Sequence, residues 1–499
     1  MPGLLSTALA LAAGILLALA FDPVRGARPR WAAVLFTVCL GVLTGVAAGS
    51  VLFLLLAVMG IASAASVFAA DILLLGVAAA LYVRARGSSA PPPGLPGPGT
   101  FRFAWLLAVA LVLVLLIVAG RLTGMSEANP WGGWDALAMW NLRAKFLAGA
   151  PGDWHFAVNG MLADRMHPDY PLLLPSFIAA GWKAGGEMGA LLPVVLSLLF
   201  SAVLIGLLAS AVAMLRGTAS ALLAALVALT TTSFLLAAPS QYADIPLACY
   251  WLCAVSLLLI SGGTSRAALV WGGACAGFGG WTKNEGVAFL VWFILALLAL
   301  LWWKRGSRDA MRGTVAALIG ASPGILLTLW LKFVIAPPAD TLVQQTSRSM
   351  MARLADTSRY GEIARSFVDA VGHMGSGIAH PLILLAILAV LLRWNPAPRY
   401  RLPMAISALA LALTFLADIA AYLITPSDLA WQLGTSFDRL LLQLWPSALL
   451  VCFAAMNGIA DPVPALHPAH GPKKASVTAG PSARASKKAP ASRAHAKGR

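Results

Sequence analysis

The sequence predicts an all-α polytopic membrane protein with about thirteen transmembrane helices. Three observations support this fold class. Of the 499 residues, 60% are hydrophobic and only 11% are charged, whereas about a quarter of the residues in a soluble protein are charged. Apolar runs of about 20 residues, the length needed to cross the hydrocarbon core, recur along the chain. The short segments between alternate runs are basic, as cytoplasmic loops usually are.

The predicted helices account for most of the chain up to position 459. They cover 3–21, 32–56, 62–83, 103–121, 188–215, 219–237, 245–261, 267–282, 286–303, 313–335, 378–392, 403–424 and 440–459. No basic segment precedes the first run and arginines follow it, which predicts a transmembrane helix with its N-terminus outside. A cleaved signal peptide is the alternative, because Ala18-Leu19-Ala20 resembles a cleavage site.

Basic residues support this orientation. If the N-terminus is outside, every short loop predicted to lie inside is basic. The residues concerned are Arg25, Arg28, Arg30, Arg84, Arg86, Arg102, Arg216, Arg266, Lys304, Arg305, Arg308, Arg312, Arg393, Arg399 and Arg401. The long polar segments 122–187 and 336–377 then lie outside, in the periplasm if this is a bacterial inner-membrane protein. Residues 359–371 have amphipathic spacing and predict a surface helix.

Composition divides the chain into four parts. Residues 1–86 are a three-helix N-terminal transmembrane section, and 87–101 are a linker too rich in Pro and Gly to be helical. Residues 102–460 are the main transmembrane region. Residues 461–499 lack apolar periodicity and predict a disordered, basic, cytoplasmic tail. The net charge of +16 is therefore attributed to loops and tail, and nucleic-acid binding is not expected.

The segment 131–175 is the longest polar interruption in the first half of the chain. Apolar residues at helical spacing over 135–147, flanked by tryptophans, predict an interfacial helix that begins at Asp135. An Asp at that position is often only a helix N-cap; the alternative is a carboxylate that acts as a general base. Two prolines then make 167–171 extended, and the apolar stretch 172–182 is short for a crossing and expected in the interface.

The residue types in the outside segments suit transfer of a group from a phosphate. A departing phosphate needs cations to stabilise it, and Lys283, Arg439 and Arg143 are the candidates. An acceptor hydroxyl or amine needs a base within hydrogen-bond reach; Asp135 is the first candidate, followed by Asp169 and Glu285. Each has a plainer alternative, such as an ion pair between Lys283 and Glu285 or an arginine that reaches lipid headgroups.

Several motifs resemble one family. The order W-D-x-x-x-x-W-N-x-x-A-K, beginning at Trp134, and then H-P-D-Y-P-L-L-L-P, beginning at His167, resembles the first periplasmic loop of the GT-C superfamily of glycosyltransferases. That superfamily includes protein O-mannosyltransferases and the aminoarabinose transferase of lipid A. Thr282–Glu285, Ser240–Asp244 and Leu429–Pro446 resemble its later polar elements. The resemblance covers roughly 102–459 and leaves the first three helices unexplained.

The resemblance implies an inner-membrane enzyme that transfers a sugar, with inversion, from a polyprenyl-phosphate carrier to a periplasmic glycan, lipid or protein. It implies a catalytic base at Asp135, with Asp169 and Glu285 as further catalytic candidates. Asp169 replaces an apolar residue of the family motif, so its role stays open. The implied substrate or lipid-phosphate ligands are Arg143, His167, Tyr170, Asp244, Lys283 and Arg439.

Other functions stay open. No phosphate loop or dinucleotide fingerprint indicates a nucleotide, and no metal ligand set is predicted. Some relatives of the superfamily use a divalent ion, but the first loop lacks a D-x-D pair, so a metal requirement is not decided. A transporter or lipid-carrier flippase is the alternative, favoured by Asp71 and Asp418 inside predicted helices. A non-catalytic assembly factor of GT-C shape is a third.

Overall fold

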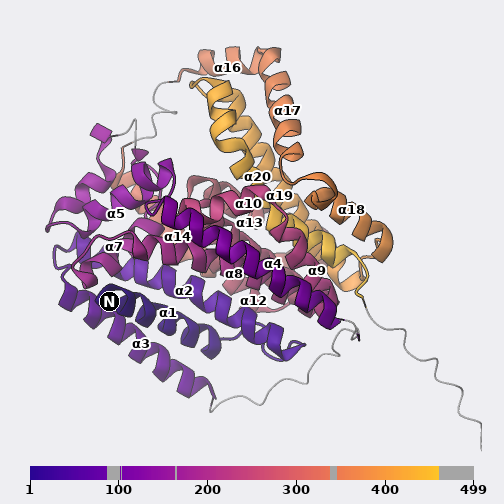
Figure 1. Ribbon diagram of the computed structural model, residues 1–499, viewed down its shortest axis with the longest axis horizontal. Coiled ribbons are helices and arrows are strands. Elements are labelled where there is room, and N and C mark those ends of the chain that lie inside the picture. Colours follow the sequence, from indigo (N-terminus) through magenta and orange to yellow (C-terminus); the bar gives the residue numbers. More distant parts are fainter. Residues whose placement is uncertain (87–101, 103, 163–165, 338–344, 460–499) are drawn as a thin grey trace, which may run out of the picture. The chain divides into compact units, whose positions relative to one another are not determined.

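A computed structural model describes residues 1–86, 102, 104–162, 166–337 and 345–459. Regular structure in these ranges is helical, with no strands, which confirms the all-α prediction. The predicted linker 87–101 and the predicted tail 461–499 lie outside the described residues. The elements described below belong to one compact unit that starts at the N-terminus (Figure 1).

Nine helices of the described part are long and apolar enough to cross a membrane. They are α1 (Pro2–Ala20), α2 (Arg30–Val58), α3 (Ala64–Arg86), α4 (Ala104–Ala128), α8 (Leu191–Arg216), α13 (Asn284–Arg305), α14 (Ser307–Trp330) continued by η5 (Leu331–Ile335), α19 (Pro398–Ile424) and α20 (Leu429–Ala455). A multi-pass membrane protein is therefore supported, but the predicted number of thirteen crossings is not confirmed.

The remaining predicted crossings are short or broken helices. α9 (Thr218–Leu229) and α10 (Thr232–Ala237) meet at a bend of 69°, and η4 (Ala238–Ser240) follows; together they would make a tenth span. α11 (Asp244–Ile260), α12 (Arg266–Thr282) and α18 (Pro381–Leu392) are shorter. A 17-residue helix such as α11 is only about 25 Å long. Apolar composition alone could not separate these helices from full crossings.

α11 is the central helix of the unit and is buried along nearly its whole length. It packs against α8, α12 and α20. Glycines allow α12 and α14 to approach closely: a Cβ at Gly277 would lie 2.6 Å from the carbonyl oxygen of Ala321. Close packing through small residues is how helices associate where lipid removes the hydrophobic driving force.

The three N-terminal helices are part of the same packed unit. α2 packs against α7 (Leu173–Gly185) and α8, and Tyr250 of α11 donates a hydrogen bond of 2.9 Å to the carbonyl of Leu43. Gly14 of α1 faces Gly41 and Gly45 of α2 without room for a Cβ. Figure 1 shows α1, α2 and α3 running side by side below α7.

The predicted interfacial segment is helical but buried. Asp135 precedes a π-helical turn, η1 (Ala136–Trp140), and α5 (Asn141–Ala148) continues from it. The side chains of Trp140 and Ala144 have no exposed surface, and α7, the predicted interfacial stretch 172–182, is also buried. Trp134 remains largely exposed. Short helices η2 (Asp153–Val158) and η3 (Gly160–Leu162) complete this region.

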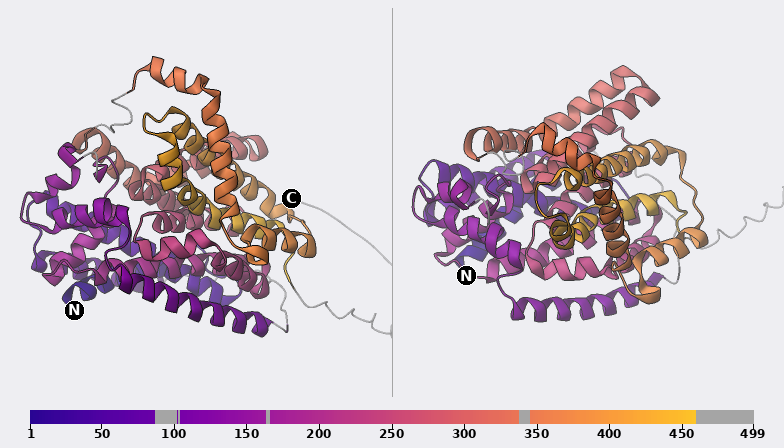
Figure 2. Two further views of the ribbon diagram at one scale, coloured as in Figure 1. Left: turned by 45° about the horizontal axis from the view of Figure 1, so that its top comes forward. Right: turned by 90° about the horizontal axis from the view of Figure 1, so that it is seen from above.

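The second long polar segment forms a helical pair beside α20. α16 (Ser347–Ala355) and α17 (Thr357–Gly372) are followed by η6 (Gly377–Ala379), and α17 confirms the predicted surface helix. α17 packs on α20 and α19, with Ile363 buried between them. Figures 1 and 2 show α17 lying along α20, and α16, which contacts α19, crosses the far end of α17.

α20 begins at Leu429 and not at the predicted position 440, so Arg439 lies within a helix and not in a loop. Asp428 caps the helix by accepting a 2.7 Å hydrogen bond from the backbone amide of Trp431. Leu429, Leu433, Phe437 and Leu440 form an apolar stripe at helical spacing that packs with Ile363 and Tyr422. Gln432, Thr435 and Asp438 lie off this stripe, whereas Ser436 lies beside it and shares a 2.7 Å hydrogen bond with the Tyr422 hydroxyl. These polar residues lower the average hydropathy of the segment.

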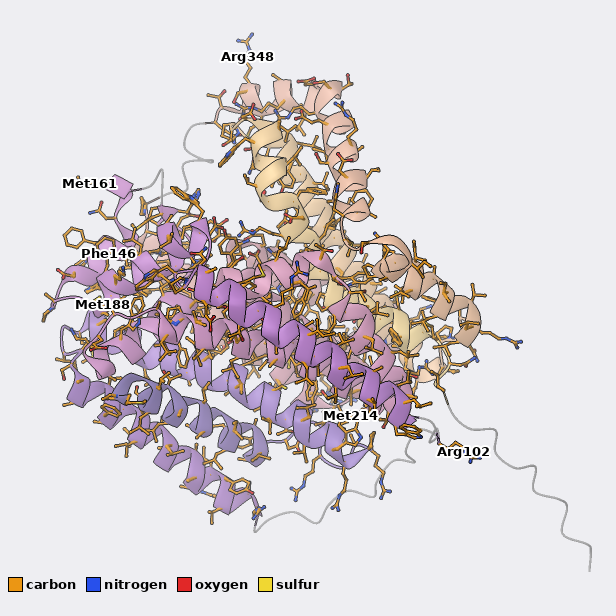
Figure 3. The ribbon with its side chains drawn as sticks, in the orientation of Figure 1. Arg102, Phe146, Met161, Met188, Met214 and Arg348 are labelled. Carbon is orange, nitrogen blue, oxygen red and sulfur yellow. The ribbon has the colours of Figure 1, made fainter. Side chains whose placement is uncertain are left out.

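Residues from the two predicted sides of the membrane lie at opposite ends of the unit. Figure 3 places Phe146, Met161 and Met188, from or beside the predicted outside segment 122–187, at one end. It places Arg102 and Met214, which border predicted inside loops, at the other end. This separation agrees with the alternation of sides that the loop charges predict.

Candidate functional site

Five charged side chains from distant segments form one continuous series of ion pairs, which we call the ion-pair chain. Its order is Asp135, Arg439, Asp244, Lys283 and Glu285. The distances are 2.7 Å for Arg439–Asp135, 2.9 Å for Arg439–Asp244, 2.9 Å for Lys283–Asp244 and 2.9 Å for Lys283–Glu285. All five were predicted as site residues from the sequence, and tertiary structure brings them together.

Asp244 is the centre of the ion-pair chain. Its carboxylate is 0% exposed and accepts hydrogen bonds from Lys283 Nζ at 2.9 Å, Arg439 Nε at 3.0 Å and Gln443 Nε2 at 2.5 Å. Asp244 also opens α11, where the helix dipole favours a negative charge. A buried carboxylate is tolerated only when it is paired and hydrogen-bonded, and these donors from α20 and the α12–α13 corner meet that condition. Asp244 thereby holds two cations next to each other.

Asp135 is not used as a helix cap. In the described structure its side chain makes no capping hydrogen bond at η1; it pairs with Arg439 instead. Its side chain is 20% exposed, so Asp135 is a partly exposed acid at one end of the ion-pair chain. The alternative prediction, that the Asp135 side chain serves only as a helix N-cap, is therefore wrong.

Two loops hold Asp135 beside Arg439. The backbone amide of Gly133 donates to the carbonyl of Ser240 at 3.0 Å, and Gln241 Nε2 donates to the carbonyl of Pro130 at 2.9 Å. Asn141 Nδ2 in turn donates to Gln241 Oε1 at 3.0 Å. Beside them, the Tyr242 ring lies 4.4 Å from the Arg439 guanidinium, a cation–π contact.

Lys283 occupies the tight corner between α12 and α13. Its backbone is extended between the two helices, and the neighbouring Gly286 approaches Gly279 too closely for any side chain. Burial lowers the pKa of Lys283, but the carboxylates of Asp244 and Glu285 raise it by more, so its pKa lies above the ordinary value. Lys283 therefore remains an ammonium ion at neutral pH.

A second polar cluster adjoins this corner. Asp169 Oδ2 accepts from Lys332 Nζ at 2.9 Å and from Asn284 Nδ2 at 2.8 Å. Burial raises the pKa of Asp169, but Lys332, Asn284 and His167 together lower it by more, and the result is below the ordinary value. Lys332 was missed from the sequence because it lies inside an apolar run, in η5; a lysine within a predicted span is the signal that could have found it.

Arg143 is not part of the ion-pair chain. Its side chain is fully buried, and it donates to the backbone carbonyls of Ala157 at 2.7 Å, Pro168 at 3.3 Å and Tyr170 at 2.7 Å. Burial lowers the pKa of Arg143 to about 9, against the opposing effect of Asp169. These contacts hold the 167–170 turn in place. Arg143 therefore binds backbone carbonyls and does not join Lys283 and Arg439, the two other cations that were predicted to bind a phosphate.

His167 and Tyr170 lie on the same turn as Asp169. His167 is exposed and has a left-handed backbone with φ of 46°, and its ring lies 5.6 Å from that of Tyr170. Tyr170 packs edge-on against Trp140 at 5.9 Å. Burial, helped by Glu285, raises the pKa of Tyr170 well above the ordinary value, so it stays a neutral phenol. Tyr170 is thus close to the Glu285 end of the ion-pair chain, whereas His167 faces solvent.

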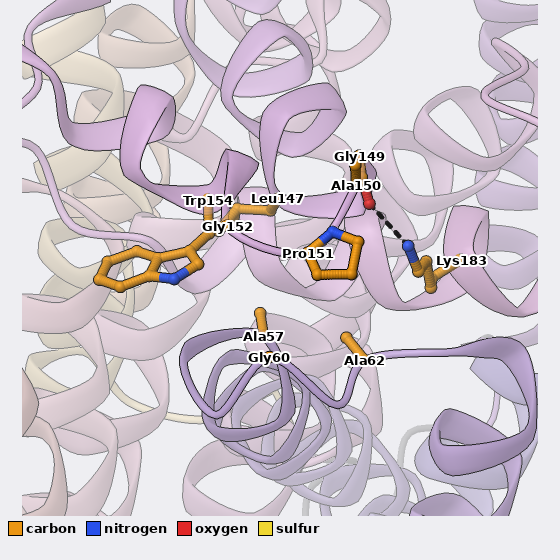
Figure 4. A pocket seen from close by; sticks show the side chains of 10 residues that line it. All are labelled: Ala57, Gly60, Ala62, Leu147, Gly149, Ala150, Pro151, Gly152, Trp154 and Lys183. Atoms are coloured by element: carbon orange, nitrogen blue, oxygen red, sulfur yellow. Dashed lines mark hydrogen bonds between the residues drawn. The ribbon is translucent and has the colours of Figure 1, made fainter.

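Two crevices in the described structure contain none of these residues. One lies between the end of α2 and the turn 149–152, where Lys183 Nζ donates to the carbonyl of Gly149 at 2.6 Å (Figure 4). The other is apolar and lies between α8, α9, α10 and α20. Neither crevice is lined by Asp135, Lys283 or Arg439. The described residues also contain no group of three or more acids, histidines or cysteines arranged to hold a metal ion.

Comparison with protein-family models, curated proteins and solved structures finds no match to this chain. The GT-C resemblance therefore rests on the short sequence motifs alone.

Proposed function

We propose that this chain is an integral membrane glycosyltransferase of GT-C type. In this proposal it takes a sugar from a polyprenyl-phosphate carrier at the periplasmic face and transfers it, with inversion, to a glycan, lipid or protein. The observation that supports it is the ion-pair chain: two cations lie beside each other on one buried carboxylate, and a further, partly exposed carboxylate, Asp135, lies at one end.

The proposed reaction uses these groups in distinct roles. The acceptor oxygen or nitrogen attacks the anomeric carbon and forms the new glycosidic bond, while the bond from that carbon to the phosphate oxygen breaks. The proton of the acceptor passes to Asp135 as general base. The electron pair of the broken bond stays on the polyprenyl phosphate, and Arg439 and Lys283 stabilise its added charge.

Replacement of Asp135 tests the base assignment. Asp135→Asn keeps the size of the side chain but cannot accept the proton, and we expect sugar transfer in the purified, membrane-reconstituted protein to fall by about 10²- to 10⁴-fold. Asp153→Asn is the matched control: it makes the same chemical change in the same region, where Asp153 accepts a hydrogen bond from the amide of Ala150 and has no ion pair among the described residues. Undiminished transfer by Asp135→Asn would remove Asp135 as the base.

A transporter or lipid-carrier flippase is the second candidate function. It is favoured by two buried carboxylates in membrane-spanning helices. Asp71 of α3 accepts a 2.5 Å hydrogen bond from Ser6 of α1, and Asp418 of α19 is 8% exposed, with no partner for Oδ2 among the described residues. Movement of a labelled lipid carrier across reconstituted vesicles, without any sugar transfer, would favour this function over the first.

A further inference from the structure

We infer that Asp135 and an incoming phosphate compete for Arg439, so that anion binding itself frees the carboxylate proposed as the base. In the observed ion-pair chain, each of the two cations is already paired with two carboxylates. This inference rests on the proposed function, because it concerns the order in which the same residues act.

Arg439 has one permanent and one exchangeable partner. Its Nε and Nη2 atoms contact Asp244 Oδ2 at 3.0 and 2.9 Å, and Nη2 also contacts Asp135 Oδ2 at 2.7 Å. Asp244 has no exposed surface and also binds Lys283 and Gln443. Breaking the Asp244 contact would leave this fully buried carboxylate with one cation where it now has two, which is costly. Asp135 is partly exposed, so it can return to water when it leaves Arg439.

The other end of the ion-pair chain has the same arrangement. Lys283 is held by Asp244 on one side and by Glu285 at 2.9 Å on the other. The Glu285 side chain is 17% exposed, comparable with Asp135, and its Oε2 atom has no partner in the described structure. Negative and positive side chains therefore alternate along the ion-pair chain. The buried Asp244 is fixed at its centre, and a partly exposed acid that a ligand could replace lies at each end.

A phosphate is suited to replace these terminal acids. Its oxygens can accept from a guanidinium and an ammonium at once, and such charge-assisted contacts are about twice as strong as neutral hydrogen bonds. Partly exposed carboxylate–cation pairs contribute little by comparison. When the phosphate takes Arg439, Asp135 no longer faces a cation and can accept a proton from the acceptor. The base would thus become available only after the donor is bound.

The test measures anion affinity and not activity. Full-length protein in lipid nanodiscs is titrated calorimetrically with farnesyl phosphate and, separately, with inorganic phosphate. If Asp135 competes with the anion, Asp135→Asn binds more tightly than the wild type, by about three- to tenfold. Glu285→Gln is a second, independent variant and is expected to act in the same direction. Asp153→Asn measures the effect of losing one negative charge from the same region without freeing Arg439.

The outcomes separate this inference from the proposed function. Tighter binding by Asp135→Asn than by Asp153→Asn supports the exchange at Arg439, and tighter binding by Glu285→Gln extends it to Lys283. A stronger response to farnesyl phosphate than to inorganic phosphate identifies a lipid-linked anion. If the wild type binds but Asp135→Asn binds equally or more weakly, the exchange at Arg439 is overturned and the anion site stands. If neither probe binds the wild type or any variant, the anion site and the exchange both fail.

Discussion

At the scale of single residues, position in the ion-pair chain distinguishes side chains of the same chemical type. Asp244 and Asp135 are both aspartates in contact with Arg439, yet the first is fully buried with three donors and the second is partly exposed. Arg143 is fully buried and donates to backbone carbonyls, whereas Arg439 is partly exposed and contacts carboxylates. Burial and partner type thus distinguish the structural contacts of Arg143 from the binding role proposed for Arg439, which residue identity alone did not.

Asp169 leads to a prediction about pH. Because its folded pKa lies below the ordinary value of about 3.9, its ionised form stabilises the fold above that value, and this contribution is lost as pH falls through the folded pKa. Asp169→Asn should therefore lower the unfolding free energy at pH 7 by about 1 to 2 kcal/mol, discounted for the partly exposed Lys332. The difference should shrink below about pH 4.

Thermal unfolding of detergent-solubilised protein between pH 7 and pH 3 measures this difference. Glu187→Gln is the control, because Glu187 is an exposed acid between α7 and α8. A deficit in Asp169→Asn that stayed constant down to pH 3 would contradict the assignment of the Asp169–Lys332 ion pair as its source.

At the scale of elements, the corner between α12 and α13 depends on how closely α12 can approach its neighbours. Lys283 follows directly on α12, so its position relative to Asp244 is set by the packing of that helix. Gly273 and Gly277 face Ala317 and Ala321 of α14 with no room for a Cβ. The glycines therefore place a cation of the candidate site as well as packing two helices.

Substitution of one such glycine tests this dependence. Gly277→Ala puts a methyl group against the Ala321 backbone, and we expect a loss of about 1 to 3 kcal/mol in stability despite the higher helix propensity of alanine. Gly120→Ala in α4 is the matched control, because nothing lies within 4 Å of its added Cβ. Equal unfolding temperatures for the two variants in the same detergent would show that α12 and α14 tolerate wider spacing.

At the scale of the whole molecule, the three N-terminal helices support the helices that carry the site. α2 lies against α7 and α8, and Tyr250 of α11, the helix that Asp244 opens, is hydrogen-bonded to Leu43 of α2. The Trp271 indole of α12 also donates to the carbonyl of Phe21, at 3.0 Å. The N-terminal section is therefore joined to the rest by packing as well as by the chain.

Removal of residues 1–86 tests this connection. Expression of residues 87–499 alone should yield aggregated protein, because faces of α7, α8 and α11 lose the helices that cover them. Co-expression of 1–86 as a separate polypeptide should restore a single symmetric peak in size-exclusion chromatography. A monodisperse truncated protein without that partner would mean that the N-terminal helices are dispensable for folding.

The sequence by itself determined the helical class, the membrane character and the identities of the five residues in the ion-pair chain. Hydropathy and helical spacing act over a few turns, so long uniform helices such as α2 and α8 were predicted close to their observed bounds. The same averaging placed the start of α20 too late, because polar residues lower the hydropathy of its first half. It also concealed Lys332, which lies within an apolar run.

Only the tertiary structure decided which charges meet. Arg439 and Asp244 are 195 positions apart and Lys332 and Asp169 are 163 apart, and no local pattern encodes those pairs. Their contacts arise because burying a charge in a helical bundle is tolerated only beside an opposite charge, so packing selects the partners. Apart from Lys332, these residues were predicted from the chain, whereas the buried central position of Asp244 and the partial exposure of Asp135 at one end follow from the packing.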